Sequence, residues 1–376
     1  MQESFKGFVA EEIDDERAYL ISLSQIPGLR LKTVDFLLKH FKSFKGLWGA
    51  TRKELEQFVD LPANFIDSFF RIKDAGDSKD LMGRLYKENI GILTLLDSKY
   101  PTSLKQIYDP PLVLYYQGSL DMEEEFMIGI VGSRRTTVYG EKVAEKFGRE
   151  LAKAGFTIIS GMARGVDSYA HKGCLDVKGK TIAVLGSGLD ITYPRENAKL
   201  ADEIKSTGVL LTEYPLGTPP LAANFPARNR IIAGLSLGVL VVEAAIKSGA
   251  LITADFAMEA GKDVFAVPGP ITSPNSEGTN NLIKQGAKLV SQAGDILEEY
   301  GFANNLTPAQ PENFFKNLTP DEDLIYETLS FTPLRVEEIA RETGWPPSKV
   351  QTILTLLELQ GVVEQRVGKQ FVKKNF

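Results

Sequence analysis

Short apolar runs alternate with longer helical stretches between about residues 92 and 300, and this alternation constrains the fold more than any other feature. The runs are rich in Val, Ile and Leu without polar alternation, as expected of strands buried on both faces. They are Phe126–Val131, Thr157–Ser160, Thr181–Leu185, Val209–Thr212, Val239–Glu243, Val264–Val267 and Lys288–Val290. Amphipathic stretches such as Glu141–Ala154 and Ala198–Ser206 lie between them. This order predicts an α/β fold with a Rossmann-like, doubly wound and mainly parallel sheet.

The residues before this region have the pattern of a helical domain. Apolar residues recur at helical spacing in Ala18–Leu23 and Val34–Phe41, and the turn Ile26–Leu29 separates the two stretches. A short Pro-Gly turn between helices is typical of a SAM-like or helix-hairpin-helix unit, whose backbone N–H groups can meet DNA phosphates. An ordinary turn in a helical packing module fits the same residues, so both interpretations stay open.

The residues after the sheet have the order of a winged helix. Three helical stretches are followed by two short strands around Gly368, which is the order typical of that module. The helices are Asp321–Ser330, Arg335–Thr343 and Ser348–Gln360, and the strands are Val362–Gln365 and Gln370–Lys373. We therefore predict a SAM-like domain at 1–75, an extended Rossmann-like domain at 76–302, a linker at 303–319 and a winged-helix domain at 320–376.

The charge of the chain is unevenly distributed. The net charge is −6, but residues 126–235 contain fifteen Lys/Arg and ten Asp/Glu, a balance of +5. A basic middle region between acidic ends gives a polyanion a local docking surface. The single cysteine, Cys174, excludes an intrachain disulfide, and with only His40 and His171 a Cys/His zinc site is not expected.

The start of the chain turns acidic soon after Met1 and lacks the basic and apolar regions of a signal peptide. No run of residues approaches the roughly 18 apolar residues of a membrane span. We expect a cytoplasmic protein with no membrane association, which also suits its sparse use of cysteine.

A turn after the first core strand carries the residues best suited to a phosphate. Gly132 lets the chain turn close to a ligand, and Ser133 and the N–H groups of the next helix can donate to a phosphate. Arg134 can hold the same phosphate in bidentate fashion, with Arg135 beside it. The turn lacks the G-x-G-x-x-G pattern of dinucleotide sites, so we expect no cofactor there.

Three further segments should meet this turn, because the carboxyl ends of parallel strands lie at one edge of a sheet. They follow later strands, and the last of them, Asn224–Arg230, is predicted to be a loop that combines base stacking with phosphate contact. For each segment, a structural turn with solvated or acid-paired arginines is the alternative. The candidate residues are Gly161, Arg164 and Gly165, then Arg195 and Lys199, and then Phe225, Arg228, Asn229 and Arg230.

Catalysis has little support in these segments. Asp167 and His171 are four residues apart on one helix face, but no nucleophile completes a catalytic set. A nucleotide phosphoribohydrolase with a similar sheet is the alternative function, and only Glu243 resembles its acidic catalytic residues. We expect Glu243 instead to order the start of the helix at Ser248–Thr253.

Several motifs of the central region resemble the DprA/Smf family in order and spacing. They cover the whole central segment, and the predicted domains at both ends also suit this family. The matching motifs are Gly129–Arg134, Ser160–Asp167, Phe225–Ile232, Ser248–Thr253, Val264–Gly269 and Gly278–Ile283.

The resemblance implies a non-enzymatic protein that binds and protects single-stranded DNA, usually as a homodimer. It implies loading of the RecA recombinase on that DNA during natural transformation. It also implies that Gly132, Ser133 and Arg134 form a phosphate pocket, which basic residues on neighbouring loops extend. The residues themselves predict no cofactor and no metal.

The first helix of the predicted winged helix is acidic, with Asp321, Glu322 and Asp323, and its recognition helix offers only Lys349 as a cation. Protein contact or auxiliary packing therefore suits that domain as well as DNA binding does. Apolar positions near Leu282–Leu297 are candidates for the dimer interface.

Overall fold

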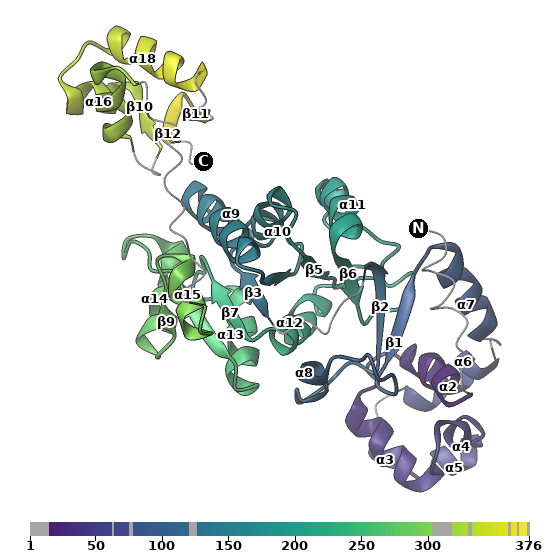
Figure 1. Cartoon of the computed structure of the whole chain (residues 1–376). Coiled ribbons are helices and arrows are strands. Elements are labelled where there is room, and N and C mark those ends of the chain that lie inside the picture. The colour runs from purple at the N-terminus through teal and green to yellow at the C-terminus, as the bar shows by residue number, and fades with distance from the viewer. Residues whose placement is uncertain are drawn as a thin grey trace.

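The computed structural model describes residues 15–61, 64–74, 78–119, 126–302, 318–329, 333–359, 362–366 and 368–373. The strands of the central region are β1 (Gly91–Thr94), β2 (Val113–Gly118), β3 (Met127–Val131), β4 (Thr157–Ser160), β5 (Thr181–Val184), β6 (Val209–Thr212), β7 (Gly238–Val241), β8 (Asp263–Ala266) and β9 (Lys288–Leu289). They form one sheet with the order β1-β2-β6-β5-β4-β3-β7-β8-β9. Strands β3 to β9 are all parallel, and β2 is antiparallel to both of its neighbours (Figure 1).

The predicted doubly wound parallel sheet is confirmed, and each of its seven predicted strands is present within a residue or two. The chain order runs from β3 outward to β6 and then restarts at β7 on the other side of β3. The reversal places a topological switch point between β3 and β7, where open α/β sheets bind their ligands. The sequence interpretation missed β1 and β2, which extend the sheet by antiparallel pairing without a helical crossover.

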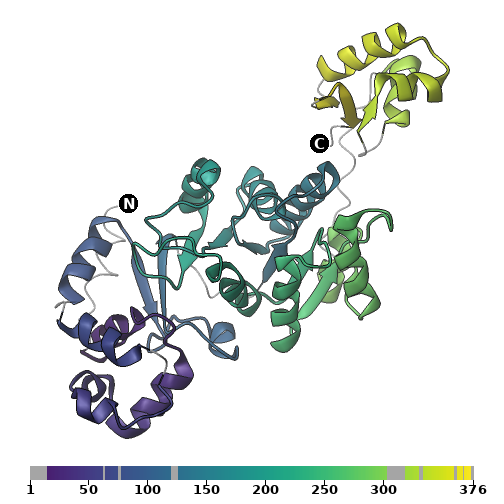
Figure 2. The same ribbon diagram turned by 180° about the vertical axis from the view of Figure 1, so that it is seen from behind.

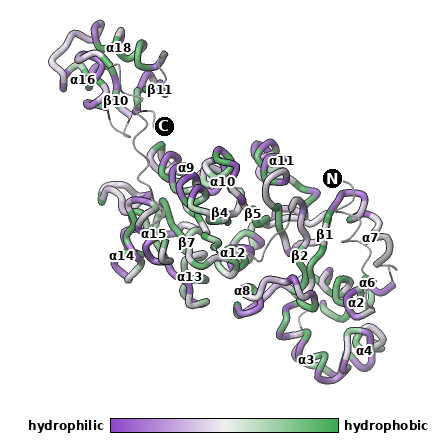
Figure 3. The backbone as a smooth tube through the Cα atoms, in the orientation of Figure 1, coloured by the Kyte–Doolittle hydropathy of each residue, from purple (hydrophilic) through white to green (hydrophobic). Residues whose placement is uncertain are grey.

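Helices cover both faces of the sheet. On one face, α9 (Val138–Lys153), α10 (Val166–Asp176) and α15 (Ala293–Glu299) share an apolar core with the strands. On the other face, α12 (Asn224–Leu235), α13 (Gly249–Glu259) and α14 (Glu277–Lys284) do the same, with α8 (Thr102–Lys105) beside them. The central strands are correspondingly apolar along their length (Figure 3).

Helices of the N-terminal part pack as a unit at the β1 end of the sheet (Figure 2). They are α2 (Asp15–Ser24), α3 (Leu31–Phe41), α4 (Phe44–Trp48), α5 (Arg52–Leu55), α6 (Phe65–Asp74) and α7 (Ser78–Lys87). Their core includes Leu20 and Phe69, and it continues through Tyr115 of β2 to α11 (Ala198–Thr207). The N-terminal helices therefore share one apolar core with the edge of the sheet.

The C-terminal elements include the three helices and two strands predicted for a winged helix, in that order, with one additional short strand between the first two helices. They are α16 (Pro320–Thr328), β10 (Leu334–Arg335), α17 (Val336–Thr343), α18 (Pro347–Leu359), β11 (Val363–Arg366) and β12 (Gln370–Lys373), around their own apolar core. Arg366 lies 3.9 Å from Glu141 of α9, and the Lys142 side chain donates a hydrogen bond to the carbonyl of Lys373. Ser330, Gln360 and most of the predicted linker lie outside the described residues.

None of the helices in the described part of the chain is long and apolar enough to cross a membrane.

The close packing of α9 on α10 depends on a glycine. A Cβ atom on Gly148 would lie 2.3 Å from the backbone carbonyl oxygen of Ala170, which cannot move without displacing α10. Gly148→Ala should therefore lower the free energy of unfolding by about 2 kcal/mol, the usual cost of overpacking. Gly83→Ala is the matched control at an exposed position of α7, where an added methyl meets open space. It should raise the free energy of unfolding by about 0.5–1 kcal/mol, and urea denaturation of both variants checks the contrast.

Candidate nucleic-acid interface

Glu243, two residues after the end of β7, fixes the turn that follows β3. Its carboxylate accepts hydrogen bonds from the Thr136 hydroxyl (2.6 Å), the Thr137 amide (2.8 Å) and the Thr137 hydroxyl (2.5 Å). Its backbone carbonyl accepts a hydrogen bond from the Ser133 amide at 2.7 Å. Since Thr137 is the N-cap of α9, Glu243 sets both the turn and the start of that helix. The prediction that Glu243 orders the helix at Ser248–Thr253 was wrong, because the helix it reaches is the one across the switch point.

The turn after β3 interlocks with the segment after β4. Gly165 has a left-handed φ of 76°, and its Val166 neighbour donates to the Ser133 carbonyl at 3.3 Å. A Cβ atom on Gly165 would lie 2.3 Å from that same carbonyl oxygen, so this close approach needs glycine. Arg134 and Arg135 remain exposed on top of the turn, with the Ser133 hydroxyl bonded to the Arg135 amide at 3.1 Å.

Arg134, Phe225 and Tyr193 form a row at this edge. The guanidinium of Arg134 lies over the Phe225 ring, 4.9 Å from its centroid. The Tyr193 ring lies on Phe225 as well, at 5.4 Å between centroids and 44° between planes. Tyr193 is 40% exposed, so one cation and two aromatic rings are presented together. The sequence interpretation did not include Tyr193, although an exposed aromatic residue in a basic segment is a usable signal.

The segment that holds Phe225 is not a loop, as was predicted, but the first turns of α12. Pro226 suggested a loop, yet proline is compatible with the first turn of a helix, where its missing N–H group has no intrahelical partner. The helical geometry turns Arg228 inward, one turn after Phe225, instead of presenting it at the surface.

Arg228 is 3% exposed and connects three segments that form one wall of the candidate interface: α12, the turn after β4 and the end of β5. It donates to the carbonyls of Gly161, at 2.8 Å, and Val184, and the carboxylate of Asp167 interacts with its charge. Burial lowers the pKa of Arg228 to about 10, so it remains a cation at neutral pH. A Cβ atom on Gly161 would lie within 2.5 Å of the guanidinium, which explains a small residue there.

Arg230 and Asn229 also have partners inside the protein. Arg230 makes a bidentate pair with Glu213 at 2.5 and 2.7 Å, and its Nε donates to the Asp109 carbonyl at 2.8 Å. The amide of Asn229 donates to the Gly249 carbonyl at 3.2 Å. For Arg228 and Arg230, the alternative of pairing inside the protein therefore describes the structure better than free contacts with phosphate.

Other predicted cations lie exposed after the next strands. Arg195 begins a short helical turn after β5, and Lys199 is 91% exposed near Glu203, at 3.7 Å. Arg164, after β4, pairs through its Nε with the carboxylate of Glu196. Lys247, on the loop after β7, is a further exposed cation at this edge, which the sequence interpretation passed over in favour of Glu243.

Asp167 and His171 do not form a catalytic pair. Asp167 accepts hydrogen bonds from the amides of Gly161 and Ala163, at 3.2 and 3.4 Å. The Thr181 hydroxyl donates to the carbonyl of Ile158, so Nδ1 of His171 donates to that hydroxyl at 2.7 Å. Burial raises the pKa of Asp167 and lowers the pKa of His171 to about 3. Both residues stabilise the interior of this wall.

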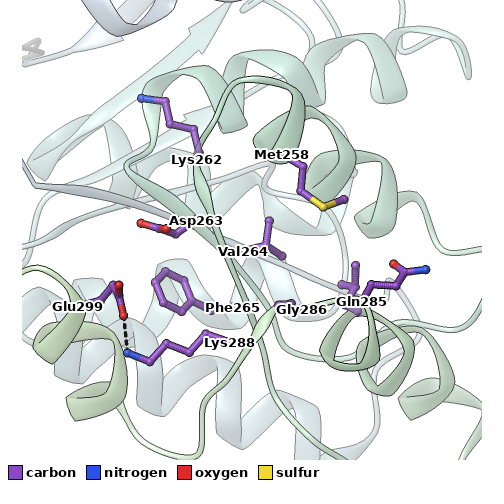
Figure 4. Close-up of a pocket in the computed structure, with 11 residues that line it drawn as sticks. Met258, Lys262, Asp263, Val264, Phe265, Gln285, Gly286, Lys288 and Glu299 are labelled. Atoms are coloured by element: carbon purple, nitrogen blue, oxygen red, sulfur yellow. Dashed lines mark hydrogen bonds and ion pairs between the residues drawn. The ribbon is translucent and has the colours of Figure 1, made fainter.

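A separate hollow of about 310 Å³ lies at the opposite edge of the sheet, around the amino end of β8 (Figure 4). Lys288 and Glu299 line it and pair at 2.6 Å, with Phe265 close to the pair and Met258 on the other side of the hollow (Figure 4). The nearby apolar positions predicted as a dimer interface are mostly used in the chain's own core, since Leu282, Val290, Ile296 and Leu297 are buried. Leu289 is 49% exposed and stays available to a partner.

The winged helix offers little positive charge on its recognition helix. Lys349, near the start of α18, pairs with Asp321 at 2.8 Å and lies 3.6 Å from the centroid of the Trp345 ring. Two neighbouring groups within its own domain therefore already engage this cation.

Replacing Arg228 should destabilise the fold rather than merely weaken binding. Arg228→Met leaves Asp167 without its counter-charge and two buried carbonyls without a donor, which should cost about 3–5 kcal/mol of unfolding free energy. Arg195→Ala removes an exposed arginine and should change that free energy by less than about 0.5 kcal/mol. Urea denaturation of both variants measures the difference, and equal stabilities would contradict the structural role of Arg228.

Comparisons with known proteins identify the family. A family model described as DNA recombination-mediator protein A matches residues 91–301, and a DprA winged helix domain model matches residues 307–369. Protein Smf of Escherichia coli is 42% identical over 323 residues, which cover 83% of this chain and 82% of that protein. DNA processing protein DprA of Streptococcus pneumoniae is 45% identical over 241 residues, covering 64% of this chain and 83% of that protein.

Two solved structures show the same similarity. The X-ray structure of DprA from Streptococcus pneumoniae has a TM-score of 0.66 at 37% identity, covering 75% of this chain and 97% of that one. DNA processing protein A from Helicobacter pylori, studied for its single-stranded DNA binding mode, has a TM-score of 0.51 at 33% identity, covering 56% and 95%. With more than half of its residues inside the family model, the chain belongs to the DprA/Smf family of DNA recombination mediators.

Proposed function

We propose that this protein binds single-stranded DNA along the carboxyl edge of its sheet and helps to load the RecA recombinase on that DNA. The row of Arg134, Phe225 and Tyr193 carries the proposal. Aromatic rings accept any base by stacking, and a neighbouring arginine holds the backbone, so the row suits a strand of any sequence. The Helicobacter pylori relative, which binds single-stranded DNA, supports the same class of ligand.

The proposed phosphate contacts divide into a pocket and an extension. Gly132, Ser133 and Arg134 form the pocket, with Arg135 and the turn of Gly161 and Gly165 around it. Arg164, Arg195, Lys199 and Lys247 extend the basic surface to the neighbouring strands. Arg228, Asn229 and Arg230 shape the wall from inside, which their internal partners favour.

The alternative of a nucleotide phosphoribohydrolase is disfavoured by the state of Glu243. A catalytic carboxylate must reach a substrate, but Glu243 is 3% exposed and accepts three hydrogen bonds from Thr136 and Thr137. The proposed activity is therefore binding without turnover. We further propose that the protein acts in the cytoplasm as a homodimer, with the domain boundaries 1–75, 76–302 and 320–376.

Arg134→Ala tests the pocket. It removes both a phosphate contact and the cation over Phe225, so affinity for oligo-dT should fall at least tenfold. The slope of log affinity against log salt should become shallower by about 0.7, because one contact to a single-stranded phosphate is lost. Fluorescence anisotropy across a salt series measures both quantities. Arg84→Ala, at an exposed position of α7 away from this edge, is the matched control and should bind like the wild type.

RecA loading is tested in the same preparations. The wild-type protein should shorten the lag of RecA assembly on single-stranded DNA, and Arg134→Ala should lose that effect in proportion to its binding. An Arg134→Ala variant with full affinity would overturn the pocket, whereas full binding by the wild type without any effect on the lag would overturn RecA loading alone.

A further inference from the structure

Two isoleucines are exposed on the loops that continue the edge beyond residues 132–135, the turn after β3 that is the proposed phosphate turn. Ile246, after β7, is 58% exposed, and Ile271, after β8, is 91% exposed. Strands β7 and β8 are the next two after β3 in the sheet, and all three are parallel. Their loops therefore emerge at the same edge as Arg134, on the side away from Phe225. Single exposed aliphatic side chains are common on protein surfaces, so these two matter only for their place on neighbouring loops at the edge that carries Arg134.

Hydrogen bonds tie these loops to the phosphate turn. The Ala244 amide donates to the Asn275 carbonyl at 2.7 Å, which joins the loop after β7 to the loop after β8. The Asn275 side chain in turn donates to the Arg135 carbonyl at 3.0 Å. The three loops after β3, β7 and β8 thus form one fixed surface, not independent segments.

The chemistry of this surface changes along its length. Lys247 is exposed beside Ile246, while residues 268–276 carry no charge and include the exposed Pro270, Ile271 and Thr272. The first acid after them is Glu277, at the start of α14. A lysine followed by a neutral, aliphatic loop suits a phosphate followed by the apolar faces of bases, because apolar side chains can pack against unstacked bases.

We propose that the DNA strand held at Arg134 and Phe225 continues across the ends of β7 and β8 on an isoleucine rim, made of Ile246, Lys247 and Ile271. In this arrangement Lys247 holds a phosphate, and the two isoleucines pack against the bases that follow the central pocket. The inference rests on the proposed function and assigns the direction in which the bound strand extends. It also explains why two aliphatic side chains are left in water at a basic edge.

The test compares oligo-dT of increasing length, from about 4 to about 20 nucleotides, on the full-length protein. Wild-type affinity should rise with length until the rim is filled. The double variant Ile246→Ser/Ile271→Ser should bind the shortest detectable oligonucleotide like the wild type and the long ones about tenfold more weakly. Val59→Ser is the matched control, because Val59 is 95% exposed in the N-terminal helical part, away from this edge.

An abasic series identifies the base contact. Removing single bases from a long oligo-dT should weaken wild-type binding at the positions over the rim. The same removals should cost the double variant little, since the two changes delete one interaction. Equal losses in both proteins at every position would overturn the base contact with the isoleucines.

The remaining outcomes separate the two proposals. If the wild type binds no oligonucleotide, the proposed function fails. If it binds short and long ones but the double variant loses neither or loses both equally, the rim fails and the proposed function stands. If the double variant differs from the wild type in oligomeric state by sedimentation, and long-oligonucleotide affinity follows that state, the rim is a contact between copies of this chain and the inference is overturned.

Discussion

The buried guanidinium of Arg228 holds the proposed binding wall together. It reaches from α12 to the carbonyls of Gly161 and Val184, at the ends of β4 and β5, with Asp167 as its counter-charge. Breaking a buried charge pair is expensive, because the remaining charge lacks both water and a partner. The loops that present exposed cations are therefore positioned by a cation that is itself withdrawn from solvent.

Glu243 connects segments in the same way on the other side of the switch point. Arg228 connects β4, β5 and α12, whereas Glu243 connects the end of β7 to the turn after β3 and the first turn of α9. The proposed phosphate turn lies between these two anchors, so its geometry is set without a ligand. Such preorganisation lowers the entropic cost of binding and leaves the exposed side chains to make the contacts.

The sequence predicted the sheet well because its signal is local: each buried strand is a short run of Val, Ile and Leu, and each is followed by a helix. The winged helix was predictable because its signal is also local: its helical stretches and short strands can each be recognised from neighbouring residues. The antiparallel strands β1 and β2 were missed, because they join the sheet without a helical crossover. Strand β10 was missed, because it has only two residues. At the site, Ser133 and Arg134 were placed correctly in a turn after β3. The inward direction of Arg228 was not predicted, because composition shows an arginine but not the helical phase that buries it.

The arginines of this edge show why an acidic chain can be suited to a polyanion. Net charge counts Arg228 and Arg230 together with Arg134. The positive charges of the first two are balanced by internal carboxylates, so they contribute little to the electrostatic potential at the surface. Arg164 differs from both, since its partner Glu196 is half exposed and the pair lies in water. Exposed ion pairs contribute little free energy, so a phosphate can replace Glu196 at small cost. The effective field at the edge is therefore set by which carboxylates can be displaced, not by the sum of charges along the chain.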